Sequence, residues 1–347
     1  MWIADKTYIF GDCSVSLFSA VSYFVDWIVY LLILLFALMW GATKTPRETD
    51  FSYADISIMH RYVPENKTYA PVWYLLIMIV LIPLIMIVVS CLWFLRDRNK
   101  KRLLWDIHSA VLGSFGAISS QLLLVVIIKN IAGIPRPDLL NRCIPDLSNV
   151  SQIDSMITRN YCLQPNIPLL NEGFRSFPSG HSSTIYASQT FLALFLFGKV
   201  QFTCRKYFTW KLVISIIYPA ITAMKIAFSR VSDNRHKVLD VILGSMIGLL
   251  FGIFFYFLYF TNPFQEKLSV AISPRKFTVG KNEHGCFHID ISTFDIDSEN
   301  SGQEEKYTES IDDEMLQNQL MPNFNTFTIP AIYKNRSYSV HNRNSGL

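Results

Sequence analysis

Three short stretches of the sequence gather side chains that can bind and transfer an anionic group. They are KNIAGIPRPD, FPSGHSS and SRVSDNRHKVLDV, beginning at Lys129, Phe177 and Ser229. Each lies beside a long apolar run, and together they supply cations, imidazoles, a carboxylate and a glycine-containing turn. The candidate site residues are Lys129, Arg136, Ser179, Gly180, His181, Arg230, His236 and Asp240.

The cations and the turn are suited to holding a phosphate ester. Lys129, Arg136 and Arg230 can surround its oxygens, and each arginine offers paired donors. Backbone amides near Ser179 and Gly180, at the positive end of a predicted helix, can add further donors. Gly180 has no Cβ, so the backbone can approach the anion closely. Such preorganised donors often make the largest contribution to catalysis.

The two histidines are suited to different tasks. His236 and Asp240 are four residues apart, so on one helix they would share a face, and Asp240 could accept a proton from one ring nitrogen. His236 would then be the nucleophile, through its other nitrogen. His181 comes from another helix and could protonate the leaving oxygen and then activate water. The sequence has no carboxylate cluster for magnesium and no zinc-like Cys/His spacing, so we expect neither metal nor cofactor.

Each stretch also has a structural interpretation. Lys129 and Arg136 could be cations that extend toward lipid head groups at the membrane edge. The turn before His181 could simply cap a helix, and His236 with Asp240 could be a structural pair. No single stretch decides between these interpretations, but the three together form a coherent phosphate site.

The composition predicts an all-α, polytopic membrane protein. Hydrophobic residues make up 51% and aromatic residues 14% of the chain, and the net charge is only +4. No basic stripe with interleaved aromatic residues suggests nucleic acid. A bilayer core requires about 20 mostly apolar residues per helix. Six runs fit this requirement: 23–40, 72–95, 107–131, 182–199, 208–228 and 237–260.

The short loops give an orientation. Lysines and arginines gather in 96–102 and around 199–206, which places these loops in the cytoplasm. Both termini are then cytoplasmic, and the loops 41–71, 132–181 and 229–236 lie on the opposite, extracytoplasmic or luminal side. All three candidate stretches fall on that side. The organelle is not predicted.

The far-side loops contain possible modification sites. The sequons at Asn66 and Asn149 would be accessible to glycosylation, whereas the sequon at Asn335 lies in a cytoplasmic segment and would remain bare. Cys143 and Cys162 share one long loop that faces an oxidising compartment. A disulfide between them is possible, but spacing alone does not establish its geometry.

We expect three segments. Residues 1–22 form a cytoplasmic N-terminal segment, and the first apolar run is a retained helix because it lacks a signal-peptide cleavage site. Residues 23–261 form the six-helix membrane domain. Residues 262–347 are polar, with an acidic block from Asp295 to Glu314, and are predicted to be a disordered cytoplasmic tail.

The three stretches resemble the signature of the type 2 phosphatidic acid phosphatase family, which shares a fold core with vanadium haloperoxidases. That signature is Lys, six residues, Arg-Pro; then Pro-Ser-Gly-His; then Ser-Arg, five residues, His, three residues, Asp. Every fixed position is present between Lys129 and Asp240. RPDLLNRC and SRVSD are similar to the lipid phosphate phosphatase branch, including fungal members that act on diacylglycerol pyrophosphate. Many relatives have a second histidine where this chain has Lys237, which bears on fine specificity.

The resemblance implies magnesium-independent hydrolysis of a lipid phosphate through a phosphohistidine on His236, with His181 as acid and base. It implies a membrane-lipid substrate of the phosphatidate, lysophosphatidate or diacylglycerol pyrophosphate class. A related phosphotransferase or head-group transferase is one alternative. A transporter without chemistry is another, although transporters usually place charged groups near the membrane midplane rather than at helix ends. The oligomeric state is not predicted.

Overall fold

The structure is a computed structural model that describes residues 7–10, 13–94, 100–146, 156–203, 208–264, 269–272, 274–281 and 287–293. These residues belong to the first of two compact units, Met1–Asp295 and Ile296–Leu347. Within them the chain forms a bundle of long helices with three small antiparallel two-stranded sheets.

The helices and strands have the following bounds. The helices are α1 (Leu17–Thr43), α2 (Val72–Leu76), α3 (Ile82–Phe94), α4 (Lys100–Ala132), α5 (Leu139–Cys143), α6 (Ile167–Gly173), α7 (Gly180–Thr203), α8 (Phe208–Leu212), α9 (Tyr218–Ser232) and α10 (Val238–Tyr259). π-Helical segments join α2 to α3 (Ile77–Leu81) and α8 to α9 (Val213–Ile217). The strands are β1 (Thr7–Phe10), β2 (Cys13–Ser16), β3 (Phe51–Ser52), β4 (Met156–Ile157), β5 (Arg275–Lys281) and β6 (Phe287–Thr293).

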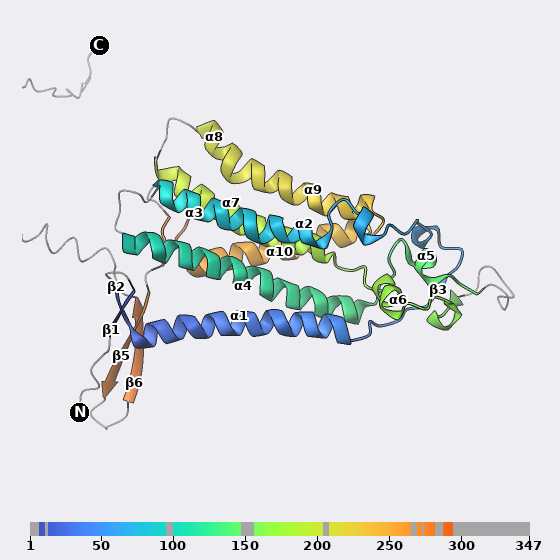
Figure 1. Cartoon of the computed structure of the whole chain (residues 1–347), viewed down its shortest axis with the longest axis horizontal. Helices are drawn as coiled ribbons and strands as arrows, with labels where there is room; N and C mark the ends of the chain where they lie inside the picture. Colours follow the sequence, from blue (N-terminus) through green and yellow to red (C-terminus); the bar gives the residue numbers. More distant parts are fainter. Residues whose placement is uncertain are drawn as a thin grey trace, which may run out of the picture. The chain divides into compact units, whose positions relative to one another are not determined.

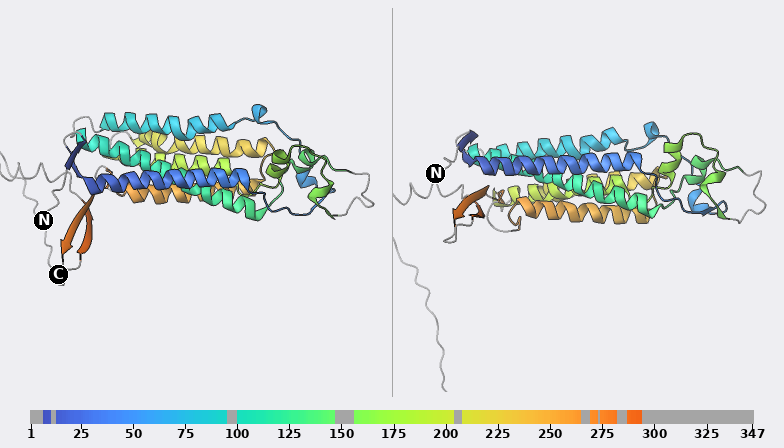
Figure 2. Two further views of the ribbon diagram at one scale, coloured as in Figure 1. Left: turned by 60° about the horizontal axis from the view of Figure 1, so that its bottom comes forward. Right: turned by 90° about the horizontal axis from the view of Figure 1, so that it is seen from below.

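The long helices lie side by side and give the bundle two distinct ends (Figures 1 and 2). At one end, here named the cap end, the connecting segments 44–71, 133–146 and 156–179 gather around α5, α6 and β3. At the other, named the hairpin end, β5 pairs with β6. The candidate stretches belong to the ends of α4 and α9 and the beginnings of α7 and α10, all of which lie at the cap end (Figure 1).

Five of the described helical stretches are long and apolar enough to cross a membrane: Phe18–Thr43, Val72–Trp93, Arg102–Ala132, Thr209–Ser232 and Val238–Tyr259. They correspond to five of the six predicted runs, so the all-α membrane architecture is confirmed, whereas the count of six is not. The remaining run lies in α7, a helix of 24 residues that is less apolar. α7 packs against α3, α4, α9 and α10, so its polar side chains meet protein rather than lipid.

A proline ties α3 to α7. The π segment Ile77–Leu81 comes just before Pro83, which has no amide hydrogen and whose ring displaces the carbonyl one turn earlier. The carbonyl of Ile79 instead accepts a hydrogen bond from Ser188 Oγ of α7 at 2.9 Å. A neighbouring helix thus satisfies the backbone group that the proline leaves free, as is required inside a membrane.

α7 and α10 approach each other unusually closely. α10 presents Gly244, Gly248 and Gly252 to α7 at four-residue spacing, which the sequence analysis did not use. A Cβ on Gly244 would lie 2.6 Å from Ser179 O, and one on Gly248 would lie 2.1 Å from Ser183 O. Only glycine permits this contact between backbones. The contact brings the beginning of α7 against the beginning of α10, where two of the three candidate stretches lie.

The cap has its own small core, distinct from that of the bundle. Cys143 and Cys162 form a disulfide in it, which resolves the possibility left open by the sequence. Asn66 is exposed in a short 3₁₀ helix of the cap, whereas Asn149 and Asn335 lie outside the described residues. The buried apolar residues of the cap are Phe51, Ile58, Leu139, Leu140, Cys143, Ile157, Leu170 and Phe174.

At the hairpin end, chain beyond the predicted membrane domain packs against the bundle. Lys199 of α7 forms a buried ion pair with Asp106 of α4 and donates to Ser269 O at 2.8 Å. Asp106 also accepts from the amide of Ala271 at 2.9 Å. Ser269 and Ala271 are buried, so packed structure extends beyond residue 261, where we placed the start of a disordered tail. Residues from 294 onward lie outside the described part of the chain.

Candidate active site

A pocket of about 300 Å³ lies at the cap end of the bundle. It brings together five of the eight candidate residues: Lys129, Arg136, Gly180, His181 and His236. The other residues that line it are Ala37, Leu38, Gly41, Val126, Asn130, Glu172 and Arg175. Cations and imidazoles from distant parts of the chain therefore share one cavity.

The cations in the pocket are held by the cap. Lys129, in the last turn of α4, donates to the carbonyl of Arg175 at 2.8 Å and forms no ion pair with any carboxylate of the described residues. Arg136 pairs with Glu172 at 2.8 Å, and its Nε has no partner within the described part of the chain. Glu172 also pairs with Arg175 at 3.0 Å. One carboxylate thus faces three cations, which leaves the pocket positively charged.

His236 is oriented differently from the sequence prediction. It lies two residues before α10 rather than on it, so the shared helix face predicted for His236 and Asp240 does not exist. Its Nδ1 is 4.0 Å from Asp240 Oδ2 but only 2.7 Å from the backbone carbonyl of Ser176. A carbonyl can only accept, so Nδ1 carries the proton, and Nε2 keeps its lone pair.

Asp240 acts on His236 through Ser176. Its Oδ2 accepts from Ser176 Oγ at 2.5 Å and from the amide of Lys237 at 3.0 Å. It therefore fixes the residue whose carbonyl orients the imidazole and also caps the beginning of α10. Sequence reasoning missed Ser176, Arg175 and Glu172. Their only signal was that they are the charged and hydroxyl residues of the segment EGFRSF, which directly precedes Pro-Ser-Gly-His.

In the turn at the beginning of α7, Ser179 makes structural hydrogen bonds, whereas Gly180 lines the pocket. The amide of Ser179 donates to Asp240 O at 3.0 Å, and its hydroxyl accepts from Ser182 Oγ at 2.9 Å. We expected this amide to be free to bind a phosphate, but it is engaged inside the protein. Gly180 does line the pocket, and a Cβ there would make only ordinary contacts, with Lys129 Cε at 3.6 Å and Val125 Cγ1 at 3.9 Å. Packing alone therefore does not require glycine at this position.

His181 and Arg230 take different positions relative to the pocket. His181 lines it, and its Nε2 is buried without a hydrogen-bond partner among the described residues. Arg230 is buried outside the lining and pairs with Asp233 at 2.7 Å. Its charge still acts on His181. Of the three predicted cations, Lys129 and Arg136 therefore line the pocket, and Arg230 does not.

Burial and the charges of the pocket together set the protonation states of His236 and Glu172. Burial lowers the pKa of His236 well below its ordinary value, and the charges of Lys129 and Arg136 lower it further. Burial alone would raise the pKa of Glu172, but Arg136 and Lys129 outweigh it and lower the pKa to about 2. At neutral pH His236 is therefore an uncharged base and Glu172 is ionised.

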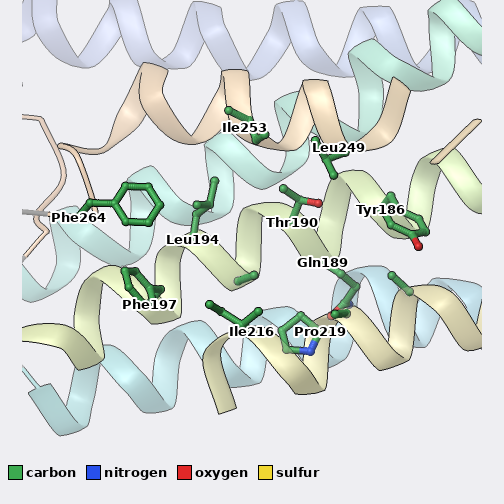
Figure 3. A pocket seen from close by; sticks show the side chains of 13 residues that line it. Tyr186, Gln189, Thr190, Leu194, Phe197, Ile216, Pro219, Leu249, Ile253 and Phe264 are labelled. Atoms are coloured by element: carbon green, nitrogen blue, oxygen red, sulfur yellow. The ribbon is translucent and has the colours of Figure 1, made fainter. Parts of the chain in front are cut away.

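A second pocket of about 290 Å³ lies within the bundle between α7, α9 and α10 (Figure 3). It is lined mainly by apolar side chains such as Leu194, Phe197 and Ile253, and contains no histidine, lysine, arginine or acid. In addition, no group of three or more His, Cys, Asp or Glu side chains in the described ranges is placed to hold a metal ion. Of these two pockets, the one at the cap end brings histidines together with cations.

Comparisons with known proteins show the family of the chain. The family model described as "PAP2 superfamily" matches residues 110–264, which include all three candidate stretches. The chain is 30% identical to "Lipid phosphate phosphatase 1" of Arabidopsis thaliana over 70% of its own length and 69% of the relative. It is 31% identical to "Diacylglycerol pyrophosphate phosphatase 1" of Saccharomyces cerevisiae, over 66% and 77% of the two chains. No solved structure gives a significant match. With its five apolar helices, the chain is an integral membrane protein that belongs to the PAP2 superfamily.

Proposed function

We propose that the protein is a lipid phosphate phosphatase that removes a phosphomonoester or pyrophosphate head group from lipids of the phosphatidate, lysophosphatidate or diacylglycerol pyrophosphate class. The observation that carries this proposal is the meeting of His181, His236 and the two cations Lys129 and Arg136 in one pocket at the end of the bundle. The similarity to relatives named as phosphatases of these lipids supports it.

In the first step, Nε2 of His236 attacks phosphorus while the bond to the lipid oxygen breaks. Nδ1 keeps its proton and donates it in a hydrogen bond to the Ser176 carbonyl, so the imidazole is held with the Nε2 lone pair toward the pocket. Lys129 and Arg136 stabilise the negative charge that develops on the phosphoryl oxygens. The products of this step are a phosphohistidine and a lipid alcohol or, from a pyrophosphate, a lipid monophosphate.

His181 assists both halves of the reaction. Burial, followed by the charge of Arg230, lowers the pKa of His181 in the empty site. The negative charge of a bound phosphate ester favours the protonated form, which then gives the proton on Nε2 to the leaving oxygen. His181 then takes a proton from the water that attacks phosphorus, which releases phosphate and restores His236. Such acid–base assistance is typically worth about 10²–10⁴ in rate. Nε2 of His181 has no hydrogen-bond partner among the described residues, which fits a group that bonds to substrate. We propose no metal or cofactor in these steps.

The position of the site supports a lipid substrate. It lies where α4 ends and α7 begins, so a phosphate at the head-group level would already be at the right depth. We further propose that this end is extracytoplasmic or luminal and that both termini are cytoplasmic. The basic residues in 96–102 and 199–206 support this orientation, because these segments adjoin the opposite end of the bundle. Glycosylation of Asn149 but not of Asn335 is expected; the reverse pattern would invert the topology.

Purified protein in detergent micelles provides the central test. We expect phosphate release from phosphatidate, lysophosphatidate and diacylglycerol pyrophosphate that persists with a chelator. His236→Asn should reduce the rate on the order of 10³-fold or more and abolish the formation of an acid-labile phosphoprotein. His60→Asn, which alters an exposed histidine of the cap, is the matched control and should retain activity.

Three results would contradict the proposal. A His236→Asn protein with full activity would remove the mechanism, and loss of activity with the chelator would show a required metal. Phosphate transfer to an added acceptor alcohol in preference to water would instead identify a transferase.

A further inference from the structure

The pocket has an apolar side that the proposed chemistry does not use. Helix α1 contributes Ala37, Leu38 and Gly41 to its lining, and α4 contributes Val126. None of these side chains can bind a phosphate or move a proton. Apart from Lys129, which is also on α4, the cations and imidazoles come from other segments, so the pocket combines a polar part with an apolar part.

The apolar part adjoins the hydrocarbon around the bundle. The membrane-spanning part of α1 is only 6% buried, the lowest value among the five apolar stretches. Leu38 is 55% exposed although it lines the pocket, so it stands at the edge between the cavity and the outer surface of the bundle. A lipid whose phosphate lies beside His236 would therefore have its hydrocarbon next to α1.

The α1 wall, which is formed by Ala37, Leu38 and Gly41, is fixed in place beside the pocket. After α1, Arg175 donates to the carbonyl of Lys44 at 2.5 Å, and the amide of Arg47 donates to Asn130 O at 2.8 Å. Gly41 lies so close to α4 that a Cβ would be 3.3 Å from Val126 Cγ1. These contacts connect the wall to residues that also line the pocket.

The opposite end of α1 is also attached. Arg275 of β5 pairs with Asp26 of α1 at 2.8 Å and donates to Ser22 Oγ at 2.5 Å. Because α1 is attached at both ends, the pocket beside it has a defined width. A pocket of defined width can discriminate between apolar groups of different size.

We propose that the α1 wall, formed by Ala37, Leu38 and Gly41, receives the hydrocarbon chain adjoining the phosphate and thereby selects among lipid phosphates by the bulk of that chain. This inference rests on the proposed function and deepens it. The wall is a specificity element that touches the lipid and takes no part in bond making.

Leu38 is the residue to alter, because its exposure allows a larger side chain without overpacking the core. Leu38→Phe should lower kcat/KM for a long-chain phosphatidate roughly tenfold, mainly through KM. It should leave the hydrolysis of a soluble ester such as p-nitrophenyl phosphate unchanged. Leu32→Phe is the matched control, because Leu32 is also a leucine of α1, is 59% exposed and does not line the pocket. Both activities should be unchanged in it.

A second variant tests the opposite direction. Leu38→Ala widens the pocket edge, so the ratio of kcat/KM for a branched-chain to a straight-chain phosphatidate should rise several-fold, a gain that misfolding would not produce. Equal losses on lipid and soluble ester in Leu38→Phe, or unchanged selectivity in both Leu38 variants, would overturn the inference. Wild-type protein that hydrolyses neither substrate would instead refute the proposed function itself.

Discussion

The two ends of α4 and α7 carry buried charges with opposite arrangements. At the hairpin end, Lys199 lies against the carboxylate of Asp106, and that carboxylate also accepts the amide of Ala271. At the cap end, Lys129 donates, within the described part of the chain, to a backbone carbonyl alone, and it faces the pocket together with Arg136. The same residue type is neutralised at one end, where Lys199 is fully buried, and left with excess positive charge at the other, where Lys129 is partly buried.

The difference separates structural from functional charge. A buried ion pair holds two helices and a following segment in register, and removing one partner leaves the other charge uncompensated. A buried cation without an anionic partner is unfavourable in the empty protein and becomes favourable when an anion binds. Charge balance, rather than residue type or burial, therefore indicates which cluster binds a ligand.

The largest expected effect is on stability at the hairpin end. Lys199→Met removes the shorter of the two ion pairs of the buried Asp106 and leaves only Arg102, at 3.7 Å, so the free energy of unfolding should fall by about 3 kcal/mol, the lower end of the range for breaking a buried pair. Titration with a denaturing detergent measures this change. The folded fraction should keep its kcat, and pairing the change with Asp106→Asn should recover part of the loss. If the Lys199→Met protein were stable but inactive, Lys199 would take part in function rather than in stability alone.

Replacing the lysine at the cap end with methionine should instead reduce activity and leave stability nearly unchanged. Lys129→Met removes a group that stabilises developing negative charge, and kcat/KM should fall about 10²–10³-fold, comparable with the loss of one oxyanion donor. The unfolding free energy should change little or rise, because no buried carboxylate loses an ion-pair partner. A loss of stability as large as that of Lys199→Met would show that Lys129 is a structural cation.

A smaller effect should follow from the link between Asp240 and His236. Ser176→Ala removes the hydroxyl that Asp240 holds but keeps the carbonyl that orients the imidazole. We expect kcat to fall about tenfold at unchanged KM, since a hydrogen bond to a charged group is worth roughly 1.5–3 kcal/mol. The double variant with Asp240→Asn should lose about as much as Asp240→Asn alone. Additive losses would mean that Asp240 acts by another route.

The smallest effect is a shift in pH dependence. Burial and the charges of Lys129 and Arg136 lower the pKa of His236, so its neutral form persists to a pH below the ordinary histidine value of 6.5. In Lys129→Met one of these charges is absent, which raises the pKa of His236 and moves the acid limb of kcat/KM to higher pH. Because the substrate is the same for both proteins, its own ionisation cancels in the comparison. A shift to lower pH would contradict the electrostatic model.

Much of the site was predictable from residue types and spacing. The three stretches predicted a phosphate site, and alternation of the apolar runs placed them at one end of the bundle, where the structure has them. Spacing could not give the partner of His236, because that partner is a backbone carbonyl supplied by Ser176, 60 positions earlier. The four-residue interval to Asp240 was misleading, because α10 begins only after His236.

The sequence alone determined the inventory of the protein: its apolar helices, its basic loops and the cations and imidazoles of its three stretches. These follow from residue chemistry and from periods within one segment. The tertiary structure decided what each group faces. It turned Ser179 inward, paired Arg230 with Asp233, joined Cys143 to Cys162 and brought α1 to the pocket. Such contacts depend on how closely helices pack, and that is set by glycines such as Gly244 and Gly248 acting across the whole bundle.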